Sequence, residues 1–456
     1  MKEYEMIVSL KSSTFTATRV SLTEKGNFMS AFVEKGWFTL PQSIVSRLSI
    51  VIGEGGSGKT ETILRTAHLV ASTYSFDIIM IDAKGDENLA PRFVASMQQA
   101  GKKRIKLFPT SPYNGWVGDG RTLYNRLMAV QSYTEPYYEG IAQMMLDLAL
   151  KSPGGPPRNS IELLRNLRLD QLRILYRGLP EQDELAGLRA EDANGVYNRY
   201  RAFFKSLDRK LDGGSTSFTF DETDAAYVKL DTVAFANECS SIGRYIVEDI
   251  AHYITCRKPK EKKVLIIIDE VSALAIENIA NLSERLRSFK GAMMLTSQSE
   301  EGLAKTLDER TRILKTSHML ILHTCNTPEK LVERAGKYKQ IHTGWSVRDQ
   351  EGTGYGTVHM SDEYIVPPDE ARRLDVGECF VIAKGAGYKV RVAPLQIDRT
   401  SVENAEAFIE QEAVFNATTQ PLEPSSKGET PVPPFTGLQR LDNNEHQKGQ
   451  SEPDKL

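Results

Sequence analysis

Several features that would place a chain in a special class of protein are missing from this sequence. Its four cysteines lie far apart and form no CxxC pair, which argues against a zinc site or a disulfide framework and fits a reducing cytoplasm. No apolar run approaches the roughly 20 residues of a membrane span, and the first residues include acids instead of the apolar stretch of a secretion signal. We therefore expect a cytoplasmic protein with no integral membrane segment.

A strong positive charge is also absent. The 57 basic and 60 acidic side chains leave a net charge of −3, so no overall field attracts nucleic acid, and any such contact has to come from a local patch. The chain contains no internal repeat, and its 456 residues are enough for two or three domains with large cores.

Residues 53–60 are the most informative part of the chain. They read Gly-Glu-Gly-Gly-Ser-Gly-Lys-Thr, they follow an apolar, β-branched run at Leu48–Ile52, and a helical pattern begins directly after them. Glycines let the backbone curl so that successive N–H groups point at phosphate oxygens, and the new helix adds the partial positive charge of its N-terminus. The pattern predicts a phosphate-binding loop, in which Lys59 reaches the β- and γ-phosphates and the Thr60 hydroxyl holds Mg²⁺. A surface glycine loop is the alternative, which the flanking strand and helix disfavour.

A second motif is the run Val264-Leu-Ile-Ile-Ile followed by Asp269 and Glu270. Five apolar residues predict a fully buried parallel strand, and two acids end it. In P-loop enzymes the first acid holds Mg²⁺ directly or through water, and the second suits a general base that polarises the attacking water. The acidic pair favours an ATPase that does mechanical work over a GTPase switch, with a strand that merely ends in two solvated acids as the alternative. The predicted cofactors are ATP and Mg²⁺.

The predicted nucleotide-binding residues are Gly53, Glu54, Gly55, Gly56, Ser57, Gly58, Lys59, Thr60 and Asp269, of which Thr60 and Asp269 hold the metal.

Two more residues are candidates for the chemistry. Gln298 follows the apolar run Gly291–Ser297, where it would lie near the γ-phosphate and report hydrolysis, although an ordinary Ser-Gln helix cap has the same spacing. Arg287 would project across a subunit interface as an arginine finger, with Arg285 as its neighbour. A solvated helix face is an equally good interpretation of these two arginines. The predicted catalytic residues are Glu270, Gln298 and Arg287.

The organisation along the chain predicts an α/β fold with a RecA-like P-loop core, a mostly parallel sheet, an inserted all-helical subdomain and a disordered C-terminal tail. Apolar and polar residues alternate in places over residues 1–46, which predicts a β-rich lead-in. The nucleotide-binding domain is expected at residues 47–130 and 214–398, and the helical periodicity of residues 131–213 predicts the inserted subdomain. Residues 399–456 are expected to form one helix, over 402–414, and then a tail too poor in apolar residues to fold.

These residues resemble the FtsK/HerA-like branch of P-loop ATPases, and within it the TraG/TraD-type coupling proteins of conjugation and type IV secretion. The resemblance spans about residues 36–395. It is carried by the lead into the loop at Leu40–Gly53, by Ile81-Asp-Ala-Lys-Gly-Asp86, by Tyr113–Trp116 with Leu123–Leu127, by Asp269-Glu270, by Thr296-Ser-Gln298, and by Tyr364–Leu374 with Gly377–Ile382. The proline of the family's Asn-Pro-aromatic element is absent here.

The resemblance implies a DNA translocase or coupling ATPase, a homohexameric ring with DNA in its pore, and relaxosome or secretion-channel proteins as partners. Coupling proteins usually begin with transmembrane helices, and no such run is present, so recruitment to the inner membrane by a partner is the corresponding expectation. Two rivals remain: a HerA-like motor for DNA processing or phage defence, and a nucleotide-gated protein adaptor. The basic runs at residues 101–106 and 257–263 are candidates for non-sequence-specific contact with DNA phosphates, or simply solvated lysines.

Overall fold

The computed structural model describes residues 4–6, 36–37, 42–231, 236–257, 263–274, 279–348 and 351–419. All of them belong to one compact unit, which spans residues 1–419. The predicted disordered tail lies outside the described residues from 420 onward, and so does most of the predicted β-rich lead-in. Of that lead-in the structure describes β1 (Tyr4–Met6), β2 (Gly36–Trp37) and the short helix α1 (Gln42–Val45).

The core of the described unit is an eleven-stranded sheet in the order β2-β1-β13-β12-β9-β3-β8-β7-β4-β6-β5. Its other strands are β3 (Leu48–Ile52), β4 (Asp77–Asp82), β5 (Ile105–Phe108), β6 (Ala225–Lys229), β7 (Val264–Asp269), β8 (Gly291–Ser297), β9 (Met319–Leu322), β12 (Glu378–Ala383) and β13 (Ala386–Val392). Only β12 runs antiparallel to its neighbours among the described strands of this sheet. The prediction of an α/β fold with a mostly parallel sheet is confirmed.

The apolar runs form central strands because both faces of the sheet are covered. Every residue of β3, β4, β7 and β8 is buried, as expected for parallel strands with helices on both sides. Successive side chains of β3 enter different cores: Val51 packs in one hydrophobic cluster, and Ile50 and Ile52 pack in the other.

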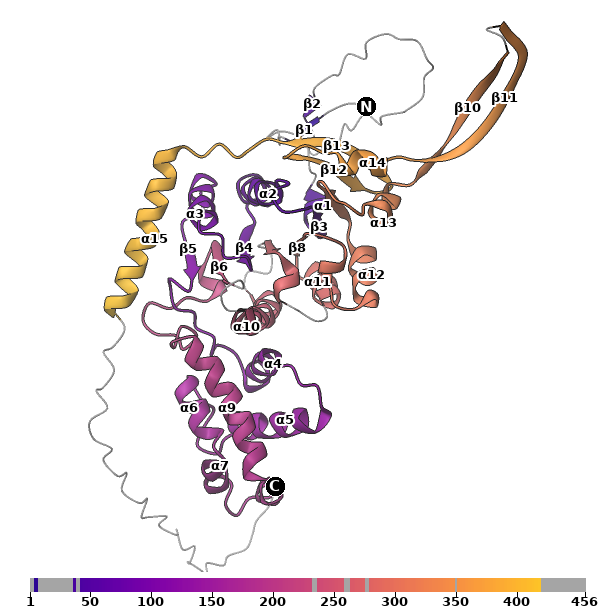
Figure 1. The fold of residues 1–456 in the computed structure, drawn as a ribbon. Helices are drawn as coiled ribbons and strands as arrows, with labels where there is room; N and C mark the ends of the chain where they lie inside the picture. The colour runs from indigo at the N-terminus through magenta and orange to yellow at the C-terminus, as the bar shows by residue number, and fades with distance from the viewer. Residues whose placement is uncertain are drawn as a thin grey trace, which may run out of the picture. The chain divides into compact units, whose positions relative to one another are not determined.

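The helices that cover the two faces come from different parts of the chain (Figure 1). One face carries α2 (Lys59–Tyr74) and α3 (Leu89–Gln99), and the other carries α10 (Ala236–Cys256), α11 (Ile279–Ser288) and α12 (Leu307–Thr316). The last described helix, α15 (Arg399–Thr419), packs against α3 and is longer than the predicted 402–414. Beyond residue 414 the side chain of Asn416 is buried and donates to the carbonyl of Thr110 at 3.1 Å, which holds the additional turn of the helix against the loop after β5.

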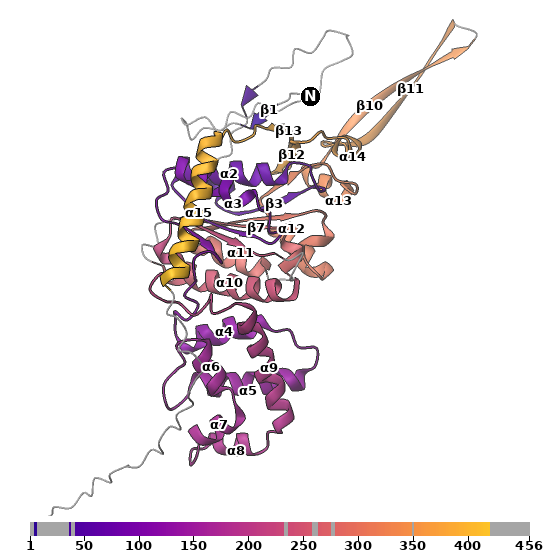
Figure 2. The ribbon, with the colours of Figure 1, turned by 60° about the vertical axis from the view of Figure 1, so that its left-hand side comes forward.

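Between β5 and β6 lie six helices, which Figure 2 shows as a group, together with connecting segments that contain two isolated β-bridges. The helices are α4 (Gly120–Val130), α5 (Pro136–Leu150), α6 (Ser160–Asn166), α7 (Leu169–Leu175), α8 (Glu181–Ala186) and α9 (Ala190–Ser206), followed by a 3₁₀ turn at Phe220–Glu222. The helix α4, which the sequence assigned to the nucleotide-binding domain, contacts both α10 and α5. The predicted division into domains remains a prediction.

A separate two-stranded sheet is formed by β10 (Lys337–Arg348) and β11 (Glu351–Tyr364). The short helices α13 (Glu329–Val332) and α14 (Pro368–Arg372) flank this hairpin in the chain. None of the helices in the described ranges combines the length and the apolar character needed to cross a membrane.

Candidate nucleotide-binding site

The glycine-rich loop lies between the end of β3 and the start of α2, as predicted. Gly58 caps the N-terminus of α2 with a φ of 103°, and Gly56 has a φ of 78°. Residues with a Cβ rarely adopt such left-handed angles. A Cβ at position 58 would also lie only 3.0 Å from the backbone nitrogen of Gly377, so glycine is required there for two independent reasons.

Backbone hydrogen bonds from neighbouring segments hold the loop in place. The N–H of Glu54 donates to the carbonyl of Thr324 at 2.9 Å, and the N–H of Gly377 donates to the carbonyl of Ser57 at 3.0 Å. Among the described residues, no acceptor takes a hydrogen bond from the amides of the three glycines at positions 55, 56 and 58. These amides at the N-terminus of a 16-residue helix fit the oxygens of a phosphate chain.

Lys59 connects the loop to the acidic strand. Its side chain is buried, and its Nζ donates to the carbonyl of Gly53 and, at 2.9 Å, to that of Glu54. Burial lowers the pKa of Lys59, and the carboxylates of Glu270 and Asp269 act in the opposite direction. The two motifs, which are far apart in the sequence, therefore lie within electrostatic reach of each other.

Asp269 ends β7 in a buried position. The hydroxyl of Thr296 on the neighbouring strand β8 donates to Asp269 Oδ1 at 2.5 Å. Burial raises the pKa of Asp269 to about 6, and the nearby carboxylates of Asp82 and Glu270 add to the shift. A buried carboxylate among other carboxylates is a favourable ligand for a hard cation such as Mg²⁺.

Glu270 follows in a left-handed backbone conformation, with a φ of 58° that is unusual for a residue other than glycine. Its N–H donates to the Thr296 hydroxyl oxygen at 2.8 Å. Its carboxylate accepts from Ser272 Oγ at 2.8 Å and from Gln298 Nε2 at 3.4 Å. The structure thus brings Gln298 next to Glu270, while the catalytic roles of both residues remain predictions.

Thr296 is a residue whose function the sequence did not reveal. One hydroxyl orients both acids, because it donates to Asp269 and accepts from the backbone of Glu270. The sequence held two signals, a hydroxyl-bearing residue inside the apolar run of β8 and the resemblance of Thr296-Ser-Gln298 to coupling proteins, and neither indicated this role.

We expect Thr296→Val to reduce both stability and activity. The N–H of Glu270 would lose its acceptor, which costs about 1–3 kcal/mol for a buried group, and the strained turn would no longer hold the carboxylate in place. The free energy of unfolding in urea and the turnover of ATP measure the two effects. Thr296→Ser, which keeps the hydroxyl, is the matched control, and equal behaviour of the two variants would show that the hydroxyl is not what matters.

His323 packs against the first glycine of the loop and the start of α2. It follows β9, its side chain is buried, and its Nε2 lies 2.9 Å from the hydroxyl of Thr62 in the first turns of α2. A Cβ on Gly53 would come within 2.5 Å of the His323 Cβ, so the first glycine of the loop is required for this close packing. Burial lowers the pKa of His323 to about 4.

His323 should make stability depend on pH. Its pKa is lower in the folded state than the ordinary value of about 6.5, so the unfolded chain binds more protons between these values, and stability falls as the pH decreases through that window. Between pH 7 and pH 5 we expect His323 to contribute a loss of about 2 kcal/mol, measured as the difference between the parent chain and His323→Gln, because the raised pKa values of Asp249 and Asp269 act in the opposite direction in both chains. Urea unfolding at both pH values tests this, with the exposed His359→Gln as control. An equal change of stability between the two pH values in the parent chain and in His323→Gln would contradict the assignment.

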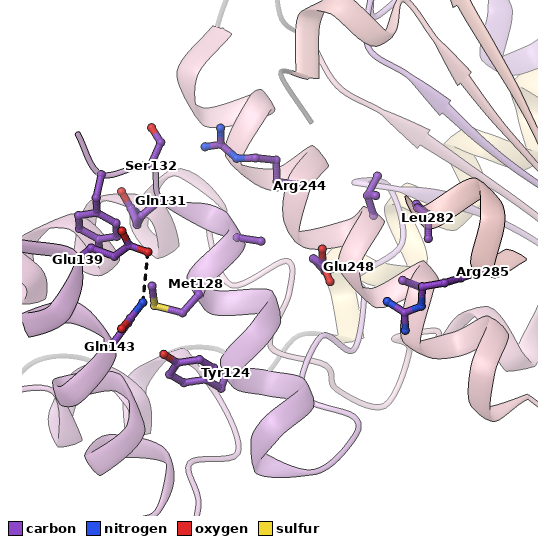
Figure 3. A pocket seen from close by; sticks show the side chains of 14 residues that line it. Tyr124, Met128, Gln131, Ser132, Glu139, Gln143, Arg244, Glu248, Leu282 and Arg285 are labelled. Atoms are coloured by element: carbon purple, nitrogen blue, oxygen red, sulfur yellow. Dashed lines mark hydrogen bonds between the residues drawn. The ribbon is translucent and has the colours of Figure 1, made fainter. Parts of the chain in front are cut away.

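Arg287, the predicted finger, lies on α11, and its side chain is outside the part of the structure that is described. Its neighbour Arg285 is exposed and lines a cavity of about 570 Å³ between α4, α5, α10 and α11, where it faces Glu248 (Figure 3). Burial raises the pKa of Glu248, and the charge of Arg285 acts in the opposite direction. None of the predicted nucleotide-binding residues lines this cavity. The cavity that Arg285 lines is therefore separate from the candidate nucleotide-binding site.

The basic runs proposed for DNA contact are largely neutralised where the structure describes them. Lys102, Arg104 and Lys106 lie within 3.6, 2.7 and 2.8 Å of Asp77, Asp224 and Glu412, respectively. Residues 258–262 of the second run lie outside the described residues. The described part of these runs therefore gives no support for a free phosphate-binding patch.

The glycine-rich loop, the buried Lys59 and the acidic pair at the end of β7 are together the features of a P-loop nucleotide-binding fold of the α/β class. No protein-family model matches the chain, and no curated protein matches it either. The chain shares its fold with the bacterial conjugative coupling protein TrwB: the unbound structure of TrwBdeltaN70 has a TM-score of 0.60 and 15% identity, covering 79% of this chain and 87% of that chain. The resemblance to coupling proteins predicted from the motifs is confirmed at the level of the fold.

Two further solved structures agree. TrwB in complex with ADP and Mg²⁺ has a TM-score of 0.59 and 15% identity, covering 79% of this chain and 88% of that one. VirB4 of Thermoanaerobacter pseudethanolicus has a TM-score of 0.51 and 10% identity, covering 78% of this chain and 91% of that one.

Proposed function

We propose that this protein is an ATPase that binds ATP with Mg²⁺ and couples its hydrolysis to the movement of DNA. The observation that carries the proposal is that the loop with Lys59 follows β3 and the acidic pair ends β7, two strands away in the same parallel order, so that both lie at one edge of the sheet. The amides of the loop glycines 55, 56 and 58 have no acceptor among the described residues. TrwB has been solved with ADP and Mg²⁺ and with a non-hydrolysable ATP analogue, which supports the same ligands here.

Different residues of the site would bind the phosphates and the metal ion. The amides of residues 55–59 and the Lys59 ammonium would bind the phosphates, and Thr60, half-buried in the first turn of α2, would hold Mg²⁺ together with Asp269. When bound, Mg²⁺ neutralises charge on the phosphates. No cluster of three or more metal-binding side chains occurs in the described ranges, which agrees with a metal held partly by the nucleotide and water.

In the chemical step, Glu270 would accept a proton from the water that attacks the γ-phosphorus, so that the bond to the β-phosphate oxygen breaks and ADP and phosphate form. Gln298, within hydrogen-bonding distance of Glu270, would orient the same water or contact the γ-phosphate. Arg287 of a neighbouring subunit would stabilise the charge of the transition state if the chains assemble into a ring.

The movement of DNA by a homohexamer is the finer part of the proposal, with relaxosome or secretion-channel proteins as partners and recruitment to the inner membrane by one of them. The fold shared with a conjugative coupling protein supports it. The pairing of Lys102, Arg104 and Lys106 with carboxylates instead favours the second candidate, an adaptor in which nucleotide only sets the state of assembly.

Turnover of ATP with and without DNA separates the two candidates. A translocase should be stimulated by single- or double-stranded DNA, with stimulation that decreases as the salt concentration rises. The mass of the nucleotide-bound complex, measured in the same samples, tests for a hexamer. Turnover that does not respond to DNA at any salt concentration would favour the adaptor, and absence of nucleotide binding would overturn the ATPase proposal itself.

A further inference from the structure

A tight turn follows β4 at residues 83–86, and the buried carboxylate of Asp82 organises it. Asp82 accepts hydrogen bonds from the N–H groups of Lys84, Gly85 and Asp86 at 2.9–3.0 Å. Its Oδ2 also accepts from the hydroxyl of Tyr227 on the neighbouring strand β6 at 2.6 Å. With four donors, Asp82 has no capacity left for a ligand, so its role is to fix the shape of the turn.

The turn is also confined from outside. Gly85 has a φ of 74°, and a Cβ there would lie 3.0 Å from the Cα of Asp231. The backbone that carries Lys84 is therefore held on two sides. Such a fixed turn gives a long side chain a defined starting point.

The place of this turn is beside the acidic pair. The strands β4 and β7 are neighbours, and Asp82 is in register with Asp269. Lys84 therefore follows β4 at the same edge of the sheet as Asp269 and Glu270. In the strand order it lies on the side of β7 that is away from β3 and β9. The glycine-rich loop with Lys59 follows β3, and in the parallel order β3-β8-β7-β4 the acidic pair at the end of β7 lies between that loop and Lys84.

The Lys84 side chain is exposed, and within the described residues its ammonium has no hydrogen-bond or ion-pair partner. Lys229, at the same edge one strand further on, is different, because it pairs with Glu87 at 2.7 Å. Two ammonium groups that repel each other beside a phosphate-binding loop become favourable neighbours once an anion lies between them.

We propose that Lys84 is a second phosphate-binding cation, which contacts the terminal phosphate of a bound nucleoside triphosphate from the side opposite the glycine-rich loop. This inference rests on the proposed nucleotide-binding function. The terminal phosphate is the group expected there because Lys84 lies beside the acids that act on hydrolysis. Lys84 would thus distinguish ATP from ADP, whereas the loop amides and Lys59 also bind the inner phosphates.

The test compares the affinity for ATP and for ADP, measured by calorimetry in a Glu270→Gln background so that ATP stays intact. Lys84→Met should weaken ATP about 10- to 100-fold, the range of a lost hydrogen bond to a charged group, and leave ADP within about twofold. Lys84→Arg, which keeps the charge, should retain most of the affinity for ATP. Lys229→Met removes a lysine from the same edge of the sheet and should change neither affinity.

The possible results separate this inference from the proposed function. Equal losses for ATP and ADP, or no loss in Lys84→Met while the parent chain binds both nucleotides, would refute the role of Lys84 and leave the ATPase proposal intact. A parent chain that binds neither nucleotide would refute both. A loss for ATP alone that Lys84→Arg restores would establish the contact, because a merely structural role would not change the ratio of the two affinities.

Discussion

Glu270→Gln should nearly abolish hydrolysis of ATP and leave binding of the nucleotide intact. The amide has the size of the carboxylate and can still accept the hydrogen bond from Ser272, so the local structure should persist. It cannot take a proton from water, and the loss of a positioned general base typically costs about 10²–10⁴ in turnover. The turnover measured under saturating ATP should therefore fall, while the affinity for ATP measured by calorimetry should stay the same.

The control for this prediction is Glu284→Gln on α11. Glu284 is exposed, whereas Glu270 is half-buried, and the partner of Glu284 is Arg312 on α12 at 3.2 Å. The Glu284→Gln variant should hydrolyse ATP at the rate of the parent chain. Turnover of Glu270→Gln within about threefold of the parent, a small part of the effect of a general base, would remove Glu270 from the mechanism.

Arg126→Met should destabilise the fold more than any surface change. The guanidinium on α4 is 1% exposed, donates to the carbonyls of Gly115 at 2.8 Å and Val117 at 2.6 Å, and pairs with Asp249 on α10. Burial raises the pKa of Asp249 to about 6, against the effect of Arg126. Without its partner the buried carboxylate is uncompensated, and we expect a loss of about 3–5 kcal/mol in the free energy of unfolding.

Urea unfolding measures this loss, and two further variants show its cause. Arg104→Met breaks an exposed pair with Asp224 and should cost less than about 1 kcal/mol. The double change Arg126→Met with Asp249→Leu should recover part of the stability, because it removes both buried charges. If Arg126→Met costs no more than Arg104→Met, the buried pair does not hold α4 against α10.

The local patterns were predictable because each depends on residues close together in the chain. A parallel strand covered on both faces has a continuous apolar run, and so β3 and β7 were visible as Leu48–Ile52 and Val264–Ile268. The left-handed backbone angles at Gly56 and Gly58 explain why these positions of the loop are glycines. The helix at the end of the described chain was predicted too short, because its last turn depends on a distant contact of Asn416 with the carbonyl of Thr110.

The sequence by itself determined the phosphate-binding loop, the acidic strand end and the α/β class, because glycine content and apolar runs are local consequences of backbone geometry and burial. Only the tertiary structure decided which distant side chains serve those motifs: Thr296 between the two acids, His323 beneath the loop, and Lys84 beside them. Their positions depend on how β8, β9 and β4 pair with β3 and β7. Pairing between strands far apart in the chain leaves no periodicity that a linear pattern could show.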